Sequence, residues 1–213
     1  MQKKIFVVAG VGTDVGKTVV SSIFAEALSA AYWKPVQAGD LDNSDSIKVG
    51  KYCSENVTVL KERYVLNTPA SPHLAAKIDG VEISLSDFEI PETDQNLIVE
   101  CAGGLMVPFN EKGDLYLDLL EKWKLPVILV SRNYLGSINH TLLSLEVLKQ
   151  RNIPVEILVF VGDSNESTES MILTKFPIEK VARIPLADVV DSEFVQSQAE
   201  IIKMNLNFDI ILQ

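Results

Sequence analysis

Short apolar runs recur along the chain, and longer stretches with helical periodicity separate them. The runs predict buried strands over residues 4–9, 32–36, 96–102, 126–131, 155–162 and 180–185. The stretches between them predict helices over residues 17–31, 44–52, 71–77, 115–123, 137–151, 168–176 and 192–205. Strands that alternate with helices predict an α/β fold in three layers, in which helices cover both faces of a mostly parallel sheet.

The same pattern indicates a single domain over residues 1–213, because it contains no internal repeat, low-complexity tract or linker rich in proline and glycine. The tail NLNFDIILQ, residues 205–213, is apolar enough to pack as a strand or as a helix. The first apolar run is too short for a signal peptide, and no run reaches the length of a membrane span. We therefore expect neither a signal peptide nor a membrane anchor.

A glycine-rich loop follows the first predicted strand, within VVAGVGTDVGKTVV at residues 7–20. Its glycines let the backbone turn so that successive N–H groups point at an anion, and the next helix begins there. Lys17 and Thr18 complete the pattern G-x-x-x-x-G-K-S/T, in which the lysine reaches the outer phosphates and the hydroxyl binds Mg²⁺. The first glycine is displaced, because a strict match needs glycine at Val11. The loop predicts a P-loop NTPase-like phosphate site.

Net charge narrows the classes of ligand, and cysteine content indicates the compartment. The formal net charge is −10 and no basic cluster occurs, which argues against binding nucleic acid through its phosphate backbone. The phosphate ligand is then expected to be a small molecule. Two cysteines, Cys53 and Cys101, form neither a disulfide framework nor a zinc-ligand set, which favours a reducing cytoplasm.

Three polar residues, Lys34, Asp45 and Glu100, fall where predicted strands end or helices begin, and ligands of open α/β sheets bind at that edge. Each has an ordinary explanation: a surface lysine, an acid in a first helical turn, and a charge at a sheet edge. Together with Lys17 and Thr18 they supply two carboxylates and a hydroxyl for Mg²⁺, and two ammonium groups for a phosphoryl group in transfer. The small residues after Glu100 leave room for a substrate.

Ordered sequence blocks cover the chain from its first strand to about Pro185: GVGTDVGKT, KPVQAG, NSD, PASPH, VECAGGLMVP, LPVILV, LGSINHTLLSLE and RIPLA. In order and spacing they resemble the dethiobiotin synthetase family of biotin synthesis. The resemblance implies that 7,8-diaminononanoate, CO₂ or bicarbonate, and ATP with Mg²⁺ are converted to dethiobiotin, ADP and phosphate. It also implies a homodimer, and no nucleic-acid or membrane partner.

The resemblance assigns roles to residues at matching positions. It implies that Lys17 and Lys34 are catalytic, and that Mg²⁺ is held by Thr18, Asp45 and Glu100. ATP would be bound by Thr13, Asp14, Val15, Gly16, Lys17, Thr18, Val19, Asp45, Glu100, Gly103, Gly162, Asp163, Pro185, Leu186 and Ala187. The substrate would be bound by Lys34, Ala38, Gly103, Gly104, Ser137, Ile138 and Asn139.

The start of the helix expected over residues 137–151 is a candidate site for an anion. Ser137 can cap that helix, whose first N–H groups are free for an anion. The resemblance implies that this helix start, with Asn139 nearby, receives the substrate carboxylate across a dimer interface. The proposed chemistry needs no histidine base, so we expect structural roles for His73 and His140.

This sequence departs from the family pattern at several positions. Cys101 stands where the family usually has glycine, and Ala38 stands where a hydroxyl residue commonly contacts the substrate. Gly162 and Asp163 occupy the place of an Asn-Asp pair whose asparagine reads adenine. A glycine offers only backbone to the base, so weak discrimination among nucleotide bases is expected unless Asn165 supplies the contact. The connection after the first helix is also short.

Alternatives from other classes remain open. A nucleotide-gated switch of the partitioning or septum-site type shares the sheet and the displaced glycine, but places a second lysine where this chain has Gly12. An amide-forming ligase of cobyrinate or a related acid would need a glutaminase domain, for which the chain has no room. A degenerate, non-catalytic family member is the third alternative, because of Ala38 and Cys101.

Overall fold

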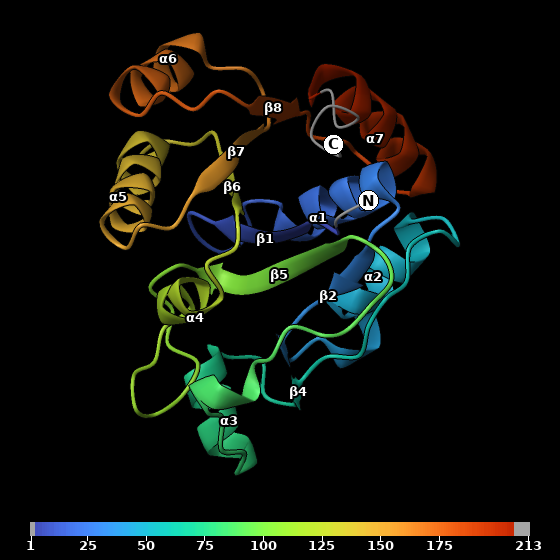
Figure 1. Cartoon of the computed structure of the whole chain (residues 1–213), viewed down its shortest axis with the longest axis vertical. Coiled ribbons are helices and arrows are strands. Elements are labelled where there is room, and N and C mark those ends of the chain that lie inside the picture. Colours follow the sequence, from blue (N-terminus) through green and yellow to red (C-terminus); the bar gives the residue numbers. More distant parts are fainter. Residues whose placement is uncertain (1–2, 207–213) are drawn as a thin grey trace.

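The computed structural model describes residues 3–206, and a six-stranded parallel sheet forms its centre (Figure 1). The strand order is β2-β5-β1-β6-β7-β8. β3 and β4 form a separate parallel pair beside it. The strands are β1 (Ile5–Gly10), β2 (Ala31–Trp33), β3 (Val36–Ala38), β4 (Tyr64–Leu66), β5 (Leu97–Gly104), β6 (Val127–Arg132), β7 (Val155–Val161) and β8 (Val181–Ile184).

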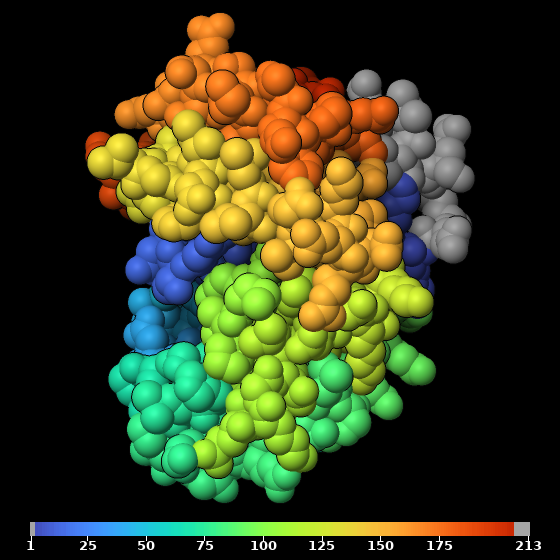
Figure 2. Space-filling view, turned by 90° about the vertical axis from the view of Figure 1, so that its left-hand side faces the viewer, coloured from blue at the N-terminus to red at the C-terminus, as the bar shows by residue number. Residues whose placement is uncertain are grey.

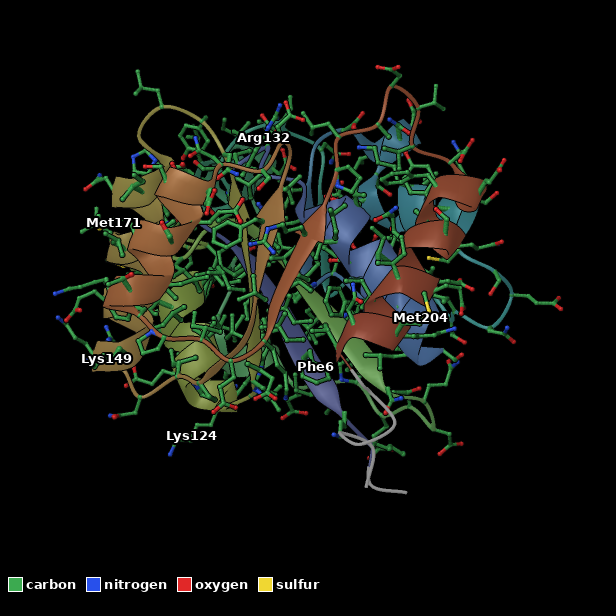
Figure 3. All side chains as sticks on the ribbon, turned by 90° about the horizontal axis from the view of Figure 1, so that it is seen from above. Phe6, Lys124, Arg132, Lys149, Met171 and Met204 are labelled. Carbon is green, nitrogen blue, oxygen red and sulfur yellow. The ribbon has the colours of Figure 1, made fainter. Side chains whose placement is uncertain are left out.

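Helices cover both faces of the large sheet. One face carries α1 (Lys17–Leu28), α2 (Asp45–Tyr52) and α7 (Ser192–Leu206). The other carries α4 (Tyr116–Trp123), α5 (Ser137–Gln150) and α6 (Glu166–Lys175), while α3 (Pro72–Asp79) contacts the β3-β4 pair. Figure 3 shows Met171 on α6 and Met204 on α7 at opposite outer sides of the molecule. The three-layer α/β prediction is confirmed.

The alternation of side chains along the central strand divides the core in two. Phe6 and Val8 of β1 pack in the core on the side of α1 and α7, whereas Val7 and Ala9 pack in the core on the side of α4 and α5. All four are at most 2% exposed. A strand buried on both faces has to be apolar throughout, which explains why the strands appear in the sequence as unbroken apolar runs.

The expected strand over residues 32–36 is two strands in the structure. β2 ends at Trp33, and β3 begins at Val36 and pairs with β4 instead of continuing in the large sheet. Pro35 stands between them and has no N–H to donate to a neighbouring strand. The break leaves Lys34 at the carboxyl end of β2, as predicted.

Glu100 was expected to close the run LIVE near the carboxyl end of the strand predicted over residues 96–102, and that expectation is wrong. β5 continues through Cys101 to Gly104, so the carboxylate lies in the middle of the strand. The continuation consists of small residues, which give a weak strand signal.

Several helix boundaries also differ from the prediction. α1 ends at Leu28 rather than residue 31, because Ser29 takes a left-handed conformation with φ of 44°. α6 begins at Glu166, where Asn165 caps it by accepting the N–H of Thr168 at 3.0 Å. The tail after residue 206 lies outside the described residues. None of the described helices is both long and apolar enough to span a membrane.

Candidate active site

A cavity of about 700 Å³ opens at the carboxyl edge of β1, β2 and β5. It brings together side chains from the glycine-rich loop, the end of β2, the start of α2 and the middle of β5, which are far apart in sequence. The lining residues are Thr13, Asp14, Gly16, Lys17, Thr18, Val19, Lys34, Gln37, Ala38, Asp40, Asp45, Lys48, Pro69, Ala70, Ser71, Pro72, Glu100, Ala102, Gly103 and Val107.

The glycine-rich loop joins β1 to α1 at one side of this cavity. Gly16 caps α1 with φ of 96°, a conformation that glycine adopts without strain. At Gly10 a Cβ would stand 2.8 Å from Cγ2 of Val15, so the loop could not fold back in the same way with a side chain there. Lys17 Nζ donates to the carbonyl oxygen of Gly12 at 2.8 Å, and burial lowers the pKa of this lysine. The lysine is thus held against the loop that it follows.

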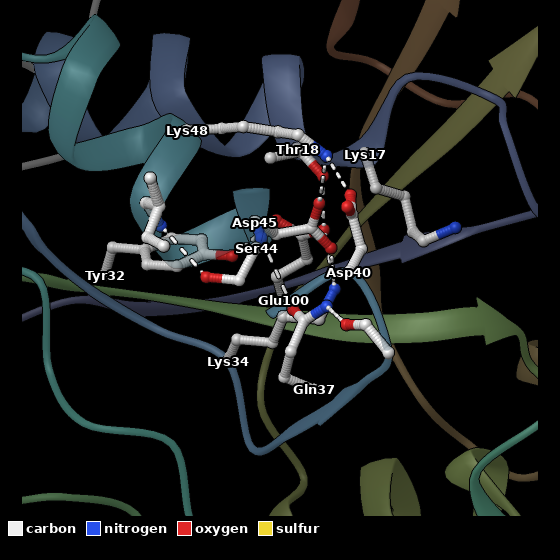
Figure 4. A network of polar contacts seen from close by, with 12 residues as sticks. Lys17, Thr18, Tyr32, Lys34, Gln37, Asp40, Ser44, Asp45, Lys48 and Glu100 are labelled. Carbon is white, nitrogen blue, oxygen red and sulfur yellow. Dashed lines mark hydrogen bonds and ion pairs between the residues drawn. The ribbon is translucent and has the colours of Figure 1, made fainter. Parts of the chain in front are cut away.

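Glu100 is 1% exposed and joins three elements. Its Oε1 accepts a hydrogen bond from the Thr18 hydroxyl at 2.9 Å, and its Oε2 accepts one from the Tyr32 hydroxyl at 2.9 Å (Figure 4). Ile98, two residues earlier in β5, packs in the core on the side of α1, so the alternation of the strand directs Glu100 to that side. The start of α1 thereby lies against the carboxylate.

Lys34 lies between the two acids that the sequence singled out. Its Nζ is 3.4 Å from Oε1 of Glu100 and also donates to Oδ2 of Asp45. Burial lowers the pKa of Lys34, but the charges of Glu100 and Asp45 outweigh it and leave the pKa above its ordinary value. The ammonium group is therefore charged at neutral pH in a site where it is only 4% exposed.

Asp45 is the first residue of α2, next to the N-cap Ser44. Burial raises the pKa of its carboxyl, but the Lys34 charge and hydrogen bond outweigh burial and hold the pKa below its ordinary value. Lys48, one turn further along α2, places Nζ 3.5 Å from Oδ1 of Asp45 and 3.3 Å from Oδ2 of Asp40. The polar cluster thus contains cations on two sides of Asp45, as Figure 4 shows.

The donor set of this cluster fits Mg²⁺. Thr18, Asp45 and Glu100 offer one hydroxyl and two carboxylates, which are the hard oxygen donors that Mg²⁺ prefers. Among residues 3–206 no group of three or more His, Cys, Asp or Glu side chains is arranged to hold a metal ion. Mg²⁺ commonly keeps waters and phosphate oxygens among its ligands, so a hydroxyl and two carboxylates suffice in a nucleotide site.

A smaller cavity of about 110 Å³ adjoins the other side of the glycine-rich loop and shares Asp14, Gly16 and Val19 with the large one. Its lining residues are Asp14, Val15, Gly16, Val19, Val20, Arg132, Val161, Ile184, Pro185, Leu186, Ala187, Val190 and Phe194. Figure 3 shows Arg132 at the edge of the sheet, and its Nη1 donates to the carbonyl oxygen of Asp14 at 3.3 Å. The cavity is mainly apolar.

Gly162 and Asp163 follow β7 close to this smaller cavity without lining it. A Cβ at Gly162 would lie 3.8 Å from Cγ of Leu186, and the carbonyl oxygen of Asp163 accepts from Asn133 Nδ2 at 2.9 Å. Asn165 uses its side-chain oxygen to cap α6, so that oxygen already has a partner within the protein.

The residues expected at the start of α5 lie in neither cavity. Ser137 was expected to cap the helix, but the N-cap is Gly136 with φ of 104°, and Ser137 is the first helical residue. The side chain of Ser137 is buried, while Tyr134 and Leu135 just before it are exposed. Ile138 and Asn139 follow in the first turn. Figure 2 shows the face on which α4, α5 and α6 lie, with the segment around α3 below them.

Three further residues that the sequence singled out are Ala38, Gly104 and Cys101. Ala38 lines the large cavity, whereas Gly104 lies against Gly12 of the loop, where an added Cβ would be 3.5 Å from the Gly12 Cα. Cys101 is buried in the core on the opposite side of the sheet from Glu100, and burial raises the pKa of its thiol to about 12.

Neither histidine lines either cavity. His140 Nδ1 lies 2.6 Å from the hydroxyl of the exposed Tyr134, at the start of α5. His73 is the second residue of α3.

Sequence reasoning missed several residues of the site. Lys48 lies three residues after Asp45 in α2, a spacing that places both on one side of a helix and could have identified it. Gln37, whose Oε1 accepts the backbone N–H of Asp45 at 3.3 Å, and Tyr32 carry no comparable signal, because their partners are distant in sequence.

Comparisons with known proteins agree with this geometry. The model of a family described as an AAA domain matches residues 4–193. A ParA family ATPase from Chlorobium tepidum has the same fold, with a TM-score of 0.56 and 15% identity, covering 95% of this chain and 93% of that one. The P-loop NTPase-like prediction is confirmed, but this likeness concerns the fold alone.

Curated relatives are far more similar in sequence. The ATP-dependent dethiobiotin synthetase of Christiangramia forsetii is 51% identical over 198 residues, which are 92% of this chain and 95% of the relative. That of Brucella ovis is 46% identical over 188 residues, 88% of each chain. These similarities do not favour a partitioning or septum-site switch. They show that the chain belongs to the ATP-dependent dethiobiotin synthetase family.

Proposed function

We propose that this protein is a single-domain cytoplasmic cyclo-ligase that forms dethiobiotin from 7,8-diaminononanoate, CO₂ and ATP. The observation that carries the proposal is the position of Lys34, whose charged ammonium group lies between Glu100 and Asp45 in a large cavity beside a phosphate-binding loop. The identity to named dethiobiotin synthetases over nearly the whole chain supports it. Both cysteines are free, as expected in a reducing compartment.

The proposed reaction consumes three substrates and yields three products, namely dethiobiotin, ADP and phosphate. One amine of 7,8-diaminononanoate attacks CO₂ to give a carbamate and loses a proton. A carbamate oxygen attacks the γ-phosphorus of ATP, and the bond from that phosphorus to the β-phosphate oxygen breaks to release ADP. The second amine attacks the carbonyl carbon of the mixed anhydride and loses a proton, and the C–O bond to the phosphoryl group breaks to release phosphate and close the cyclic urea.

Two lysines supply the charge that this transfer needs. Phosphoryl transfer depends mainly on positioning and on neutralising charge at the phosphate oxygens. Lys17 and the N–H groups at the start of α1 would bind the β- and γ-phosphates. Lys34 also lines the cavity, at the carboxyl end of β2, and would neutralise the charge that gathers between the carbamate and the γ-phosphorus.

Thr18, Asp45 and Glu100 would hold Mg²⁺. The ion would neutralise phosphate oxygens of the nucleotide when bound. These side chains lie within hydrogen-bond distance of one another or of Lys34, which supports their acting as one ligand set.

We place the nucleotide across both cavities. Thr13 to Val19 would surround its phosphates, and the base would lie in the smaller cavity against Pro185, Leu186 and Ala187. Gly162 and Asp163 would flank it from the end of β7. The base would mainly make apolar contacts there, since most lining side chains of this cavity are apolar.

The diamine would lie in the large cavity beside Lys34, Ala38 and Gly103, with Gly104 behind it against the loop. Its carboxylate would be bound at the start of α5 in a second copy of the chain, by the N–H groups of Ile138 and Asn139, since the Ser137 N–H already donates to the carbonyl oxygen of Tyr134 at 3.0 Å.

The surface around that helix start supports a homodimer. Tyr134 and Leu135 precede α5 and Leu143 lies within it, and all three apolar side chains are exposed. Apolar side chains gathered on one exposed face favour a protein interface.

The direct test is product formation by the purified protein. Incubation with 7,8-diaminononanoate, bicarbonate and MgATP should give dethiobiotin by mass spectrometry, with one ADP for each dethiobiotin. Omission of any one substrate should abolish the product. ATP hydrolysis without dethiobiotin would show that the proposed function is wrong and would favour a switch-type ATPase, whereas inactivity towards ATP would favour a degenerate family member.

A further inference from the structure

Tyr32 contacts one of the proposed metal-binding carboxylates from inside the molecule. It is the middle residue of β2, is 0% exposed, and packs in the core between the sheet and α1. Its hydroxyl donates to Oε2 of Glu100 at 2.9 Å. Glu100 lines the large cavity, whereas Tyr32 does not. The hydrogen bond therefore reaches the carboxylate from the core and not from the space where substrates would bind.

The two oxygens of Glu100 thus have different surroundings. Oε1 accepts the Thr18 hydroxyl at 2.9 Å and lies 3.4 Å from Lys34 Nζ, and both of these side chains line the cavity. Oε2 accepts the Tyr32 hydroxyl. Figure 4 shows Tyr32 and Lys34 reaching Glu100 from different directions. Oε2 is thus bound from the core, and Oε1 contacts side chains that line the cavity.

The Tyr32 bond matters because a glutamate does not fix its own carboxylate. The last torsion of the side chain is broad, so packing alone leaves the two oxygens free to rotate. A buried carboxylate oxygen without a donor costs free energy, so the orientation that keeps the Tyr32 bond is preferred. In the register of the sheet Tyr32 is opposite Ile98, on the same face as Glu100, which brings the ring close to the carboxylate.

We propose that Tyr32 is a positioning residue, which holds Oε2 of Glu100 so that Oε1 is presented to Thr18, Lys34 and the metal ion. The inference rests on the proposed function, because that function supplies the expectation that Mg²⁺ binds in this cavity together with a nucleotide. It extends the site beyond the residues that touch substrate or metal, to a hydroxyl in the core. Partners that orient metal ligands commonly change metal affinity by 10- to 100-fold when they are removed.

The test is the binding of Mg²⁺ to the Tyr32→Phe variant, which keeps the ring and removes only the hydroxyl. Isothermal titration of Mg²⁺ into protein saturated with ADP should show a dissociation constant for Mg²⁺ about 10-fold higher than that of the unchanged protein. The affinity for ADP without metal should stay within about twofold, because Tyr32 lies outside the cavity. The turnover number should fall more than the Michaelis constant for the diamine rises.

Tyr116→Phe is the matched control. Tyr116 is also 0% exposed, but it packs in the core on the opposite side of the sheet, in α4. Loss of its hydroxyl should leave the Mg²⁺ dissociation constant unchanged. Urea unfolding of both variants measures any effect on stability, so that a purely structural role of Tyr32 would lower the unfolding midpoint without changing Mg²⁺ binding.

A double-mutant cycle decides whether Tyr32 acts through Glu100. In the Glu100→Gln background, Tyr32→Phe should cause little further change in Mg²⁺ binding, because the oriented carboxylate is already gone. An equal loss in both backgrounds, or a Tyr32→Phe variant whose Mg²⁺ affinity is within twofold of the unchanged protein, would overturn the proposal. These titrations need no dethiobiotin, so they distinguish failure of this inference from failure of the proposed function.

Discussion

Lys34 carries a charged ammonium group although the residue is only 4% exposed. This charge should therefore stabilise the transition state strongly at the point where negative charge develops. We expect Lys34→Ala to lower the turnover number by about 100-fold or more, because preorganised charge in a dry site contributes several kcal/mol to transition-state stabilisation. The dissociation constant of ATP should change much less, since Lys17 and the loop still hold the phosphates. Single-turnover kinetics and ATP titration separate the two effects.

Lys34→Arg is the conservative comparison for the same position. The planar guanidinium does not place its charge as an ammonium group does, so this variant should also lose most turnover. Near-normal turnover in either variant would remove Lys34 from the chemistry.

The two carboxylates lead to a prediction about metal. Asp45→Asn and Glu100→Gln should each raise the Mg²⁺ concentration needed for half-maximal activity, because a neutral amide compensates the cation less well. The double variant should bind almost no Mg²⁺ with nucleotide. Asp42→Asn, an exposed acid close by, is the control and should titrate normally. Unchanged Mg²⁺ titrations in both single variants would exclude these residues from the metal site.

β7, β8 and α7 contribute residues to the wall of the smaller cavity. The base would meet apolar side chains there, Gly162 offers only backbone, and the Asn165 oxygen caps α6. One directional contact worth about 1 kcal/mol is therefore missing, and phosphate and metal contacts do not distinguish bases. We expect ATP, GTP and CTP to support turnover efficiencies within about tenfold of one another. A hundredfold preference for ATP under identical Mg²⁺ and diamine would contradict this.

The elements also show how far the sequence determines the structure. The strands of the large sheet were predictable because burial on both faces requires apolar runs, as in β1 and β6. β3 and β4 were not predicted, because each has three residues and their pairing joins segments far apart in sequence. The end of β5 was misplaced because small residues follow Glu100, and the cap of α5 was misassigned because a positive φ at Gly136 replaces a side-chain cap.

Some residues of the candidate site could be identified from the sequence and others could not. Lys17 and Thr18 were identifiable from a local motif, and Lys34, Asp45 and Glu100 from their places at predicted strand and helix ends. Tyr32 was not identifiable, because its role depends on the register between β2 and β5, which is a property of the folded sheet.

At the scale of the whole molecule, the exposed apolar residues around α5 predict a dimer. Sedimentation should show a dimer at micromolar concentration, and Leu135→Asp with Leu143→Asp should weaken it, since a charge in an apolar interface is costly. Activity per molecule should fall with dissociation, because each site would lose the α5 start of its partner. Met204→Asp, at another exposed apolar position on the opposite side of the molecule, is the control. Full activity of a monomer at high dilution would contradict the shared site.

The most direct test of the mechanism is the fate of oxygen from bicarbonate. The carbamate oxygen that attacks the γ-phosphorus comes from CO₂ and leaves with the phosphate when the ring closes. Bicarbonate labelled with ¹⁸O, in a reaction short enough to avoid exchange with water, should transfer one labelled oxygen to phosphate for each dethiobiotin formed. Mass spectrometry of the released phosphate measures this. Unlabelled phosphate from labelled bicarbonate would mean that water attacks ATP, and would contradict a phosphorylated carbamate in the reaction.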